Sequence, residues 1–378
     1  MATTPLGELA RLFLRLGITS FGGPAAHIAM MEDEVVQRRG WFTRAEFLDL
    51  VGATSLIPGP NSTELAIHIG HRRAGWPGLL VAGASFILPA VLIVAALAWA
   101  YVRLGSLPEV GWLLYGVKPV VIAVVLQALW RLGTTAVTSP LLATVAALSV
   151  VAVLLHVNEI AVLGLAGALV ALIRSGTAGA GRVASSALPL GIPLGLGGVA
   201  AASMSVGLWP LFLFFAKVGS VLFGSGYVLL AFLRSGLVME RGWLTESQLL
   251  DAIAVGQLTP GPVFTTATFI GYLLARAPGA AVATVGIFLP AFFFVAISGP
   301  LVPRIRRSRV AGAVLDGVNA ASLALMAVVS VQLGAAALVD GATMVLAAVS
   351  LVALVRWRVN SAWLVFGGAA AGLLVQMP

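Results

Sequence analysis

The 378-residue sequence contains no cysteine and few charged residues. The absence of cysteine excludes disulfides, thiolate metal sites and iron–sulfur clusters. Asp, Glu, Lys and Arg make up 10% of the chain, whereas a soluble globular chain carries roughly 25%. Hydrophobic residues make up 60%, and the mean hydropathy is +1.05. This composition predicts an all-α polytopic membrane protein with the lipid bilayer as a partner. We expect it in the cytoplasmic (inner) membrane.

Several functional signals are also missing. No Gly-x-x-x-x-Gly-Lys-Ser/Thr motif occurs, which disfavours an ATP-driven pump. The net charge of +8 has no basic soluble domain to carry it, so we expect no nucleic-acid partner. His68 and His71 have no cysteine or intervening Glu, so we expect no metal site and no cofactor. Arg11 and Arg15 interrupt the first apolar stretch, which excludes a cleavable signal peptide.

What the sequence does contain is an internal repeat. Phe21-Gly22, Arg39-Gly40-Trp41 and Pro58-Gly59-Pro60 recur 202 residues later as Phe223-Gly224, Arg241-Gly242-Trp243 and Pro260-Gly261-Pro262. Two copies of one hydrophobic unit, each interrupted by glycine and proline, are typical of a secondary transporter. The predicted division is a first repeat over 1–174, a linker rich in small residues over 175–206, and a second repeat over 207–378.

Each half contains five apolar stretches, so we expect about ten transmembrane helices. Between the first and second stretch of each half lies a segment that breaks at Pro-Gly-Pro, which we expect to be broken or re-entrant. Loop arginines fall at non-equivalent places in the two halves, and an odd number of spans per half then predicts inverted repeats. The expected spans are 8–30, 76–102, 112–132, 138–156, 159–174, 208–238, 279–302, 311–333, 338–356 and 360–377, with broken segments at 46–70 and 248–274.

The two Pro-Gly-Pro motifs are the sharpest candidate site. Prolines on either side of a glycine remove two backbone donors, and helix restarts readily at the second proline. A single copy would indicate a surface turn. Inside apolar segments, unpaired backbone is tolerated only when it is buried in protein or lines a watery cavity. A restarted helix offers free N–H groups to an anion. The candidate binding residues here are Pro58, Gly59, Pro60, Asn61, Ser62, Thr63, Pro260, Gly261, Pro262, Thr265 and Thr266.

A second matched pair lies near the end of each first span. Gly22 and Gly23 correspond to Gly224 and Ser225, where glycine indicates either close helix packing or a helix break. Six residues before each motif stands a cation, Arg15 in the first repeat and Lys217 in the second. Arg15 could extend to the membrane interface, whereas Lys217 falls near the middle of its span. Together with the Pro-Gly-Pro turns, the two cations predict one cage for a small oxyanion.

Glu64 and His27 are the candidates for a coupling site. Glu64 lies one turn after Pro60 in an apolar stretch, and Thr266 takes its place in the second repeat. A buried carboxylate there could carry a proton, or it could neutralise a neighbouring arginine.

These residues resemble the chromate ion transporter family. The resemblance rests on Phe21-Gly22-Gly23-Pro24-Ala25-Ala26-His27-Ile28-Ala29-Met30, on Trp41, and on both Pro-Gly-Pro motifs, each followed by a glycine about ten residues on, Gly70 and Gly271. It covers essentially the whole chain and implies two oppositely oriented halves that export chromate from the cytoplasm, with sulfate as the close analogue. Gln257 precedes the second motif as the family pattern implies, but Ser55 fills the equivalent first-half position.

The sequence therefore predicts a secondary transporter that exports chromate, driven by membrane potential, proton coupling or both. A dianion leaving an interior-negative cell is pushed outward by roughly 4.6 kcal/mol at 100 mV, twice the single-charge value. Three alternatives stay open, namely a transporter of sulfate or another small anion, a channel, and a polytopic membrane enzyme. A homodimer is also left open.

Overall fold

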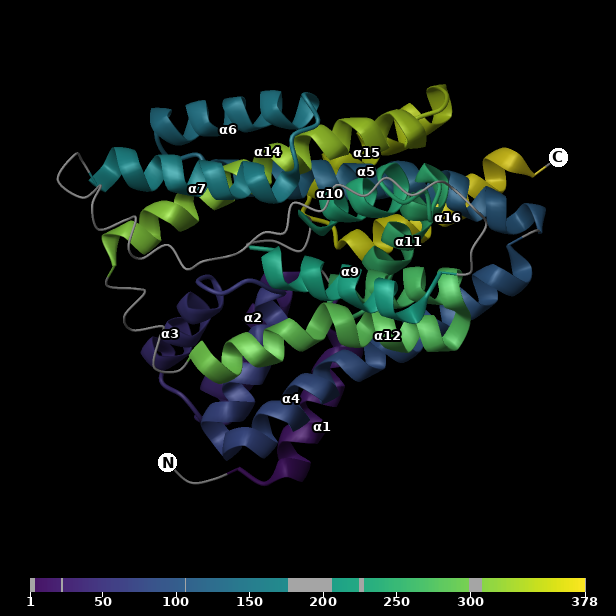
Figure 1. Cartoon of the computed structure of the whole chain (residues 1–378). Coiled ribbons are helices and arrows are strands. Elements are labelled where there is room, and N and C mark those ends of the chain that lie inside the picture. The colour runs from purple at the N-terminus through teal and green to yellow at the C-terminus, as the bar shows by residue number, and fades with distance from the viewer. Residues whose placement is uncertain are drawn as a thin grey trace.

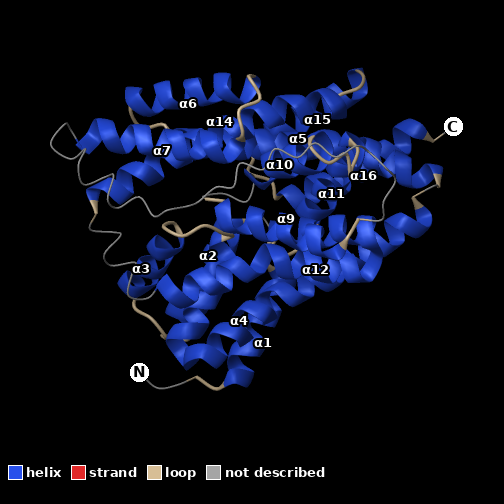
Figure 2. Ribbon diagram, in the orientation of Figure 1, coloured by secondary structure: helices blue, strands red, loops and turns tan. Residues whose placement is uncertain are grey.

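The computed structural model describes residues 4–21, 23–105, 107–175, 206–223, 228–298 and 308–377. Within these ranges the chain forms helices and short connections and contains no strand (Figures 1 and 2). The prediction of an all-α polytopic membrane protein is confirmed. The linker expected over 175–206 lies almost wholly outside the described residues, so the domain division stays a prediction.

Equivalent helices occur in the same order in both halves, and apart from α2 and α10 they begin 201 or 202 residues apart when η4 and α12 are taken together. The first half contains α1 (Leu6–Thr19), α2 (Pro24–Glu32), the π-helix η1 (Asp33–Arg38), α3 (Arg44–Thr54), α4 (Asn61–Leu104), α5 (Pro108–Ala136), α6 (Pro140–Leu154) and α7 (Glu159–Ser175). The second contains α9 (Leu208–Val221), α10 (Leu229–Leu233), the π-helix η3 (Arg234–Met239), α11 (Glu246–Leu258), the 3₁₀ turn η4 (Val263–Thr265), α12 (Thr266–Ser298), α14 (Arg309–Ala337), α15 (Gly341–Arg356) and α16 (Ser361–Gln376).

Four helical stretches of the described chain are long and apolar enough to cross a membrane: α4, α5, η4 with α12, and α14. Five shorter apolar helices accompany them, so the number ten stays a prediction. One expectation is wrong in detail. The spans over 8–30 and 208–238 are not continuous helices, because α1 ends at Thr19 before α2 begins at Pro24, and α9 ends at Val221 before α10 begins at Leu229.

The two longest helices contain a sharp turn. Inside α4, Ala74 and Gly75 leave helical geometry, and a Cβ on Gly70 would collide with the carbonyl oxygen of Gly78. In a straight helix two residues eight positions apart would be about 12 Å apart, so the chain folds back here. α12 turns in the same way at Ala275. The arm of α4 between Pro60 and this turn is about 20 Å long, too short to cross about 30 Å of hydrocarbon.

The repeats interlock in two groups of helices (Figure 1). In one group α5 packs against α15 and α16 of the other repeat, and α14 packs against α6 and α7. In the second group α1 packs on α4, α9 packs on α12, and α4 packs on α12. Because equivalent helices make reciprocal contacts, the two repeats are related by an approximate two-fold axis. Their inversion across the membrane stays a prediction.

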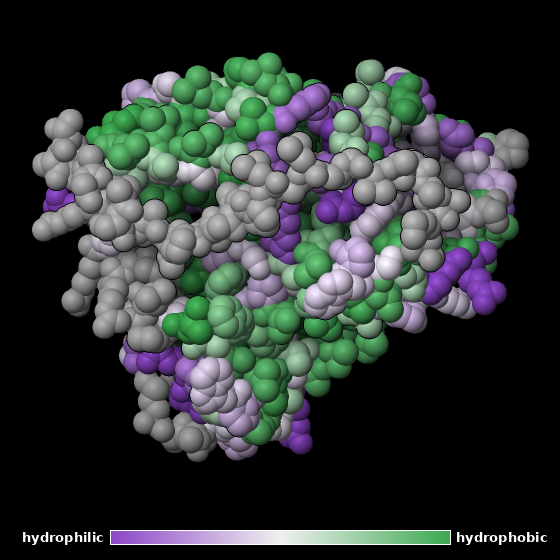
Figure 3. All heavy atoms as spheres, viewed as in Figure 1, coloured by the Kyte–Doolittle hydropathy of each residue, from purple (hydrophilic) through white to green (hydrophobic). Residues whose placement is uncertain are grey.

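The outer surface is rich in exposed apolar side chains. Trp130, Val331 and Leu374 are each more than 70% exposed. Figure 3 shows hydrophobic residues over much of the visible face, with smaller hydrophilic patches between them and toward the edges. Water would penalise such a surface, whereas lipid tails accept it. The surface therefore agrees with a protein embedded in a bilayer.

Candidate functional site

Both Pro-Gly-Pro turns lie inside the protein, as the sequence predicts. All three residues of the second turn are buried, as are Gly59 and Pro60 of the first, and Pro58 is partly exposed. Each turn follows a short helix, α3 or α11, and precedes a new one, α4 or η4 with α12. Backbone broken at this depth is therefore covered by protein.

Each turn is bonded to the first helix of the other repeat. The Gly59 N–H donates to the carbonyl of Leu222 at 2.7 Å, and the Gly261 N–H donates to the carbonyl of Ser20 at 2.9 Å. Leu222 and Ser20 are the residues that end α9 and α1. The turn before α4 thus lies at the end of α9, and the turn before η4 and α12 lies at the end of α1. Discontinuous helices arranged in this way form the substrate and ion sites of many secondary transporters.

Only glycine fits the centre of these turns. The φ angles of Gly59 and Gly261 are +142° and +89°, a region that other residues rarely adopt. A Cβ on Gly261 would lie 2.8 Å from the Cβ of Ala90, and one on Gly59 would collide with the Glu64 carboxylate. The carboxylate of Glu64 therefore lies directly against the first turn.

His27 joins three backbone elements next to the first turn. Its side chain is buried, with Nε2 3.2 Å from the Ser20 carbonyl and Nδ1 3.2 Å from the Ser62 hydroxyl. A carbonyl oxygen only accepts hydrogen bonds, so Nε2 carries the proton. The neutral ring then leaves Nδ1 to accept from Ser62. His27 consequently fixes the start of α4 to the end of α1.

Polar atoms without partners gather just after the first turn. Glu64 is fully buried, and neither carboxylate oxygen has a hydrogen-bond partner among the described residues. The side-chain oxygens of Asn61 and Thr63 are also buried and unpaired there. The Asn61 and Ser62 N–H groups begin α4 and precede its first internal bonds, which start at Thr63. Buried polar atoms that lack partners mark the place of water or an ion.

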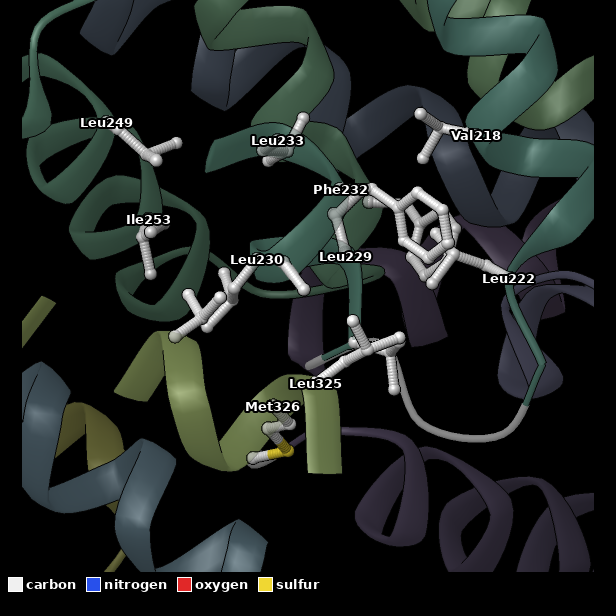
Figure 4. Close-up of a cluster of buried hydrophobic side chains, with 14 of the residues drawn as sticks. Val218, Leu222, Leu229, Leu230, Phe232, Leu233, Leu249, Ile253, Leu325 and Met326 are labelled. Carbon is white, nitrogen blue, oxygen red and sulfur yellow. The ribbon is translucent and has the colours of Figure 1, made fainter. Parts of the chain in front are cut away.

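The second turn has a different environment. The hydroxyls of Thr265 and Thr266 donate to the carbonyls of Pro262 and Val263, each at 2.8 Å. The Gln257 amide nitrogen is buried without a partner in the described chain, while Ser55, its equivalent, is exposed. Leu229 occupies the place of His27 and packs with Leu222, Phe232 and Leu325 in an apolar cluster (Figure 4). The unpaired carboxylate and the histidine thus occur at the first turn alone.

The chain is similar in sequence to a known family of membrane transporters. The sequence profile of the chromate transporter family matches residues 7–172 and again residues 209–373. The chain belongs to the chromate transporter family. It is 36% identical over its whole length to a chromate transport protein of Cupriavidus metallidurans, of which it covers 94%. It is 34% identical over 94% of its length to a probable chromate transport protein of Synechococcus elongatus, covering 91% of that protein. No solved structure matches it.

In this transporter the two matched cations are not at the turns. Arg15 is 50% exposed and pairs with Glu34 at 2.5 Å, and Glu34 also binds Arg38 and Arg39. Lys217 is exposed and lines a small pocket whose described walls include Glu159 and Arg241 but neither Pro-Gly-Pro turn. The structure therefore does not join Arg15 and Lys217 in one cavity, and their binding role stays a prediction. Gly22, Gly224 and Ser225 lie outside the described residues; Gly23, at φ +79°, precedes α2.

Two features of this transporter were not predicted from the sequence. One is Ser20, whose carbonyl accepts from both Gly261 and His27; its position immediately before the repeated Phe-Gly motif was the available signal. The other is a buried ion pair between repeats. Asp251 of α11 accepts from the Tyr101 hydroxyl at 2.8 Å and lies 3.0 Å from Lys118 Nζ. The pair ties α11 to α4 and α5.

Proposed function

We propose that this protein is a secondary transporter that exports chromate across the cytoplasmic membrane. The observation that carries the proposal is the set of buried, unpartnered polar groups at a helix break between interlocked repeats. Two further facts support it. Three relatives that match 86% or more of the chain are named chromate transport proteins, one of them as probable. The sequence also has no nucleotide-binding motif, so a gradient must supply the energy.

The oxyanion site is proposed at the beginning of α4. The first-turn N–H groups of Asn61 and Ser62 and the Thr63 hydroxyl are donors, and the Asn61 amide offers an NH₂ beside the oxygen that lacks a partner. The positive end of the helix dipole adds to them. A tetrahedral dianion accepts several hydrogen bonds at once, so it suits a site rich in donors without a fixed cation. The corresponding threonines of the second turn already donate to backbone, which favours the first turn as the binding turn.

Glu64 is proposed as the proton site. Its carboxylate lies against the same turn, and no described cation pairs with it. A negative carboxylate and a dianion at one buried site repel each other strongly because the dielectric screening is low. Binding of the oxyanion therefore requires a protonated Glu64. A dianion that leaves with one proton moves one net negative charge, worth roughly 2.3 kcal/mol at 100 mV.

The test is uptake of labelled chromate into inverted membrane vesicles under imposed potentials and at several pH values. We expect uptake to follow the potential and to increase as pH falls. Glu64→Gln mimics the protonated state and should keep uptake while removing its pH dependence. Thr266→Val changes the equivalent position of the second repeat and should leave the pH profile as in the wild type.

Each outcome has a defined meaning. Absence of chromate uptake, with uptake of sulfate instead, would replace the substrate and keep the carrier. Uptake that is unaffected by unlabelled chromate on the opposite side would indicate a channel. A Glu64→Gln variant with the wild-type pH profile would remove Glu64 from coupling.

A further inference from the structure

A second cavity lies away from the Pro-Gly-Pro turns. Its volume is about 360 Å³, and it lies between the end of α4, the start of α11 and the bend in α12. By the same measure of volume, one water molecule needs about 10–15 Å³. The cavity therefore has room for a small ion that keeps part of its hydration shell. No residue of the proposed binding turn lines it, and the second turn is about 15 Å away along α12, so this cavity is separate from the proposed site.

The polar lining of this cavity consists mainly of hydrogen-bond donors. Arg276 supplies a guanidinium, Gln248 an amide NH₂ and Trp243 an indole N–H. The Gln248 amide oxygen already accepts from the Thr245 N–H, which directs its NH₂ elsewhere. In the described chain neither that NH₂ nor the indole N–H has an acceptor.

Among the described residues, no carboxylate lines the cavity. Tyr101 does line it, but its hydroxyl donates to Asp251, and Asp251 is neutralised by Lys118. The described lining therefore combines one uncompensated cation with two unused donors. An anion is the ligand that this combination fits.

Arg276 stands where the backbone favours glycine. Its φ is +56°, in the left-handed region, and the residue before it has the same unusual geometry as Ala74 in the first repeat. There the equivalent residue is Gly75, with φ +62°. Glycine thus satisfies this bend without strain, as helix C-termini commonly do. The bend itself does not account for an arginine, and Arg276 is one of the residues that line the cavity.

We infer that this cavity is a peripheral site for a tetrahedral oxyanion, with Arg276 as its cation. The transported ion as its ligand rests on the proposed function, whereas an anionic lipid headgroup presents the same chemistry. The site collects the anion at one end of the α12 arm, whose other end is the second Pro-Gly-Pro turn. A cation at the rim of a transport path raises the local anion concentration and steers binding.

The test compares Arg276→Gly with Arg358→Gly in phosphatidylcholine proteoliposomes. Arg358 is also exposed and also has a positive φ, +52°, but it does not line the cavity. Both variants lose one charge and one strained side chain. We expect Arg276→Gly alone to raise the KM for chromate by about fivefold, the effect of an exposed ion pair. Its kcat should be unchanged, its melting temperature unchanged or higher, and its salt dependence weaker.

A second arm distinguishes a lipid headgroup. Phosphatidylglycerol is added to each purified protein, and the rise in melting temperature is measured. A rise that Arg276→Gly loses and Arg358→Gly keeps, with no change in KM, assigns the site to lipid. If Arg276→Gly matches the wild type in both arms, the inference is overturned. If the wild type moves no chromate, the proposed function fails and the phosphatidylglycerol arm alone decides on the cavity.

Discussion

The first Pro-Gly-Pro turn has an unpaired carboxylate and a histidine beside it, whereas the second, 202 residues later, has threonines bonded to backbone and an apolar cluster. Around the first turn the chain places hydroxyls, an imidazole and a carboxylate; at the equivalent positions of the second it places larger apolar side chains or a threonine. The equivalent pairs are Ser20 and Leu222, His27 and Leu229, Ser62 and Phe264, and Glu64 and Thr266. The backbone is nevertheless the same, including the reciprocal bonds from Gly59 and Gly261.

This difference indicates that the backbone of the turns and the side chains around them have separate roles. The backbone geometry of a broken helix is needed on both sides of the two-fold axis, because each turn caps a helix of the other repeat. A site that binds a proton is needed in only one of the two repeats. The apolar cluster around Leu229 then stabilises the second turn by burial, which costs no unpaired polar group. We interpret the second repeat as the better-packed support and the first as the repeat that carries the transport chemistry.

The largest expected effects come from alanine at the two glycines. Gly261→Ala forces a Cβ against the Cβ of Ala90 in a left-handed backbone, so both strain and overpacking apply, about 1–3 kcal/mol each. Gly59→Ala meets the movable Glu64 carboxylate instead. We expect Gly261→Ala to lower the melting temperature more, and Gly59→Ala to change the pH profile of transport more. Equal losses in both assays would contradict the division of roles.

The next largest effect is expected for Asp251→Asn, which tests how α11 differs from its equivalent helix α3. Asp251 is buried, whereas the equivalent Asp49 is exposed. Asp251→Asn leaves Lys118, itself 18% exposed, with the Ser247 hydroxyl as its remaining partner. Breaking a buried pair costs about 3–5 kcal/mol, and the partial exposure places this one near the lower limit. Chemical denaturation in detergent measures the loss.

The control for that loss is the exposed pair of Arg174 and Asp316. Asp316→Asn should cost about 0–1 kcal/mol. Comparable losses for Asp316→Asn and Asp251→Asn would mean that the Lys118 pair contributes no more than a surface contact.

The sequence predicted the burial of both turns because their neighbours are apolar and because the motif is repeated. The binding role predicted for Arg15 stays a prediction, but the helix period already indicated the face on which Arg15 lies. Leu9, Leu12, Phe13 and Leu16 form the buried face of α1, and Arg15 lies on a different face. Lys217 stands at the matched position of the second repeat, which led to the prediction that both cations bind one oxyanion. A matched position in a repeat does not by itself show where a side chain points.

Other features required tertiary structure. The break between α1 and α2 falls at the glycines before Pro24, where the sequence left close helix packing and a helix break as alternatives that composition could not separate. The partners of His27 are seven and 35 residues away, Ser20 and Ser62. Only the fold of α4 back toward α1 brings them together, so His27 could be named as a candidate but its contacts could not.

Exchanging the histidine between repeats tests the comparison directly. His27→Leu should cost about 1–3 kcal/mol, because the buried Ser62 hydroxyl loses the His27 ring nitrogen, its one side-chain partner among the described residues. Leu229→His buries an imidazole in the apolar cluster of Figure 4 and should cost a similar 1–3 kcal/mol. Thermal unfolding measures both. Transport should fall only for His27→Leu once the remaining folded protein is normalised; a loss in both variants would place chemistry in the second repeat as well.

The smallest effect concerns the caps of α6 and α15, which are equivalent helices. Ser139 caps α6, and Asp340 caps α15. Hydrogen bonds from the Thr343 N–H and the Tyr115 hydroxyl lower the pKa of Asp340 below its usual value. A carboxyl with a depressed folded pKa stabilises the protein above its unfolded pKa of about 3.9 and loses this contribution as pH falls through the folded value.

Asp340→Ser gives α15 the cap of α6. The variant should melt slightly below the wild type at pH 7, and the difference should shrink as pH falls below about 4. A difference that is constant from pH 7 to pH 3 would show that the charge of Asp340 contributes nothing to the cap.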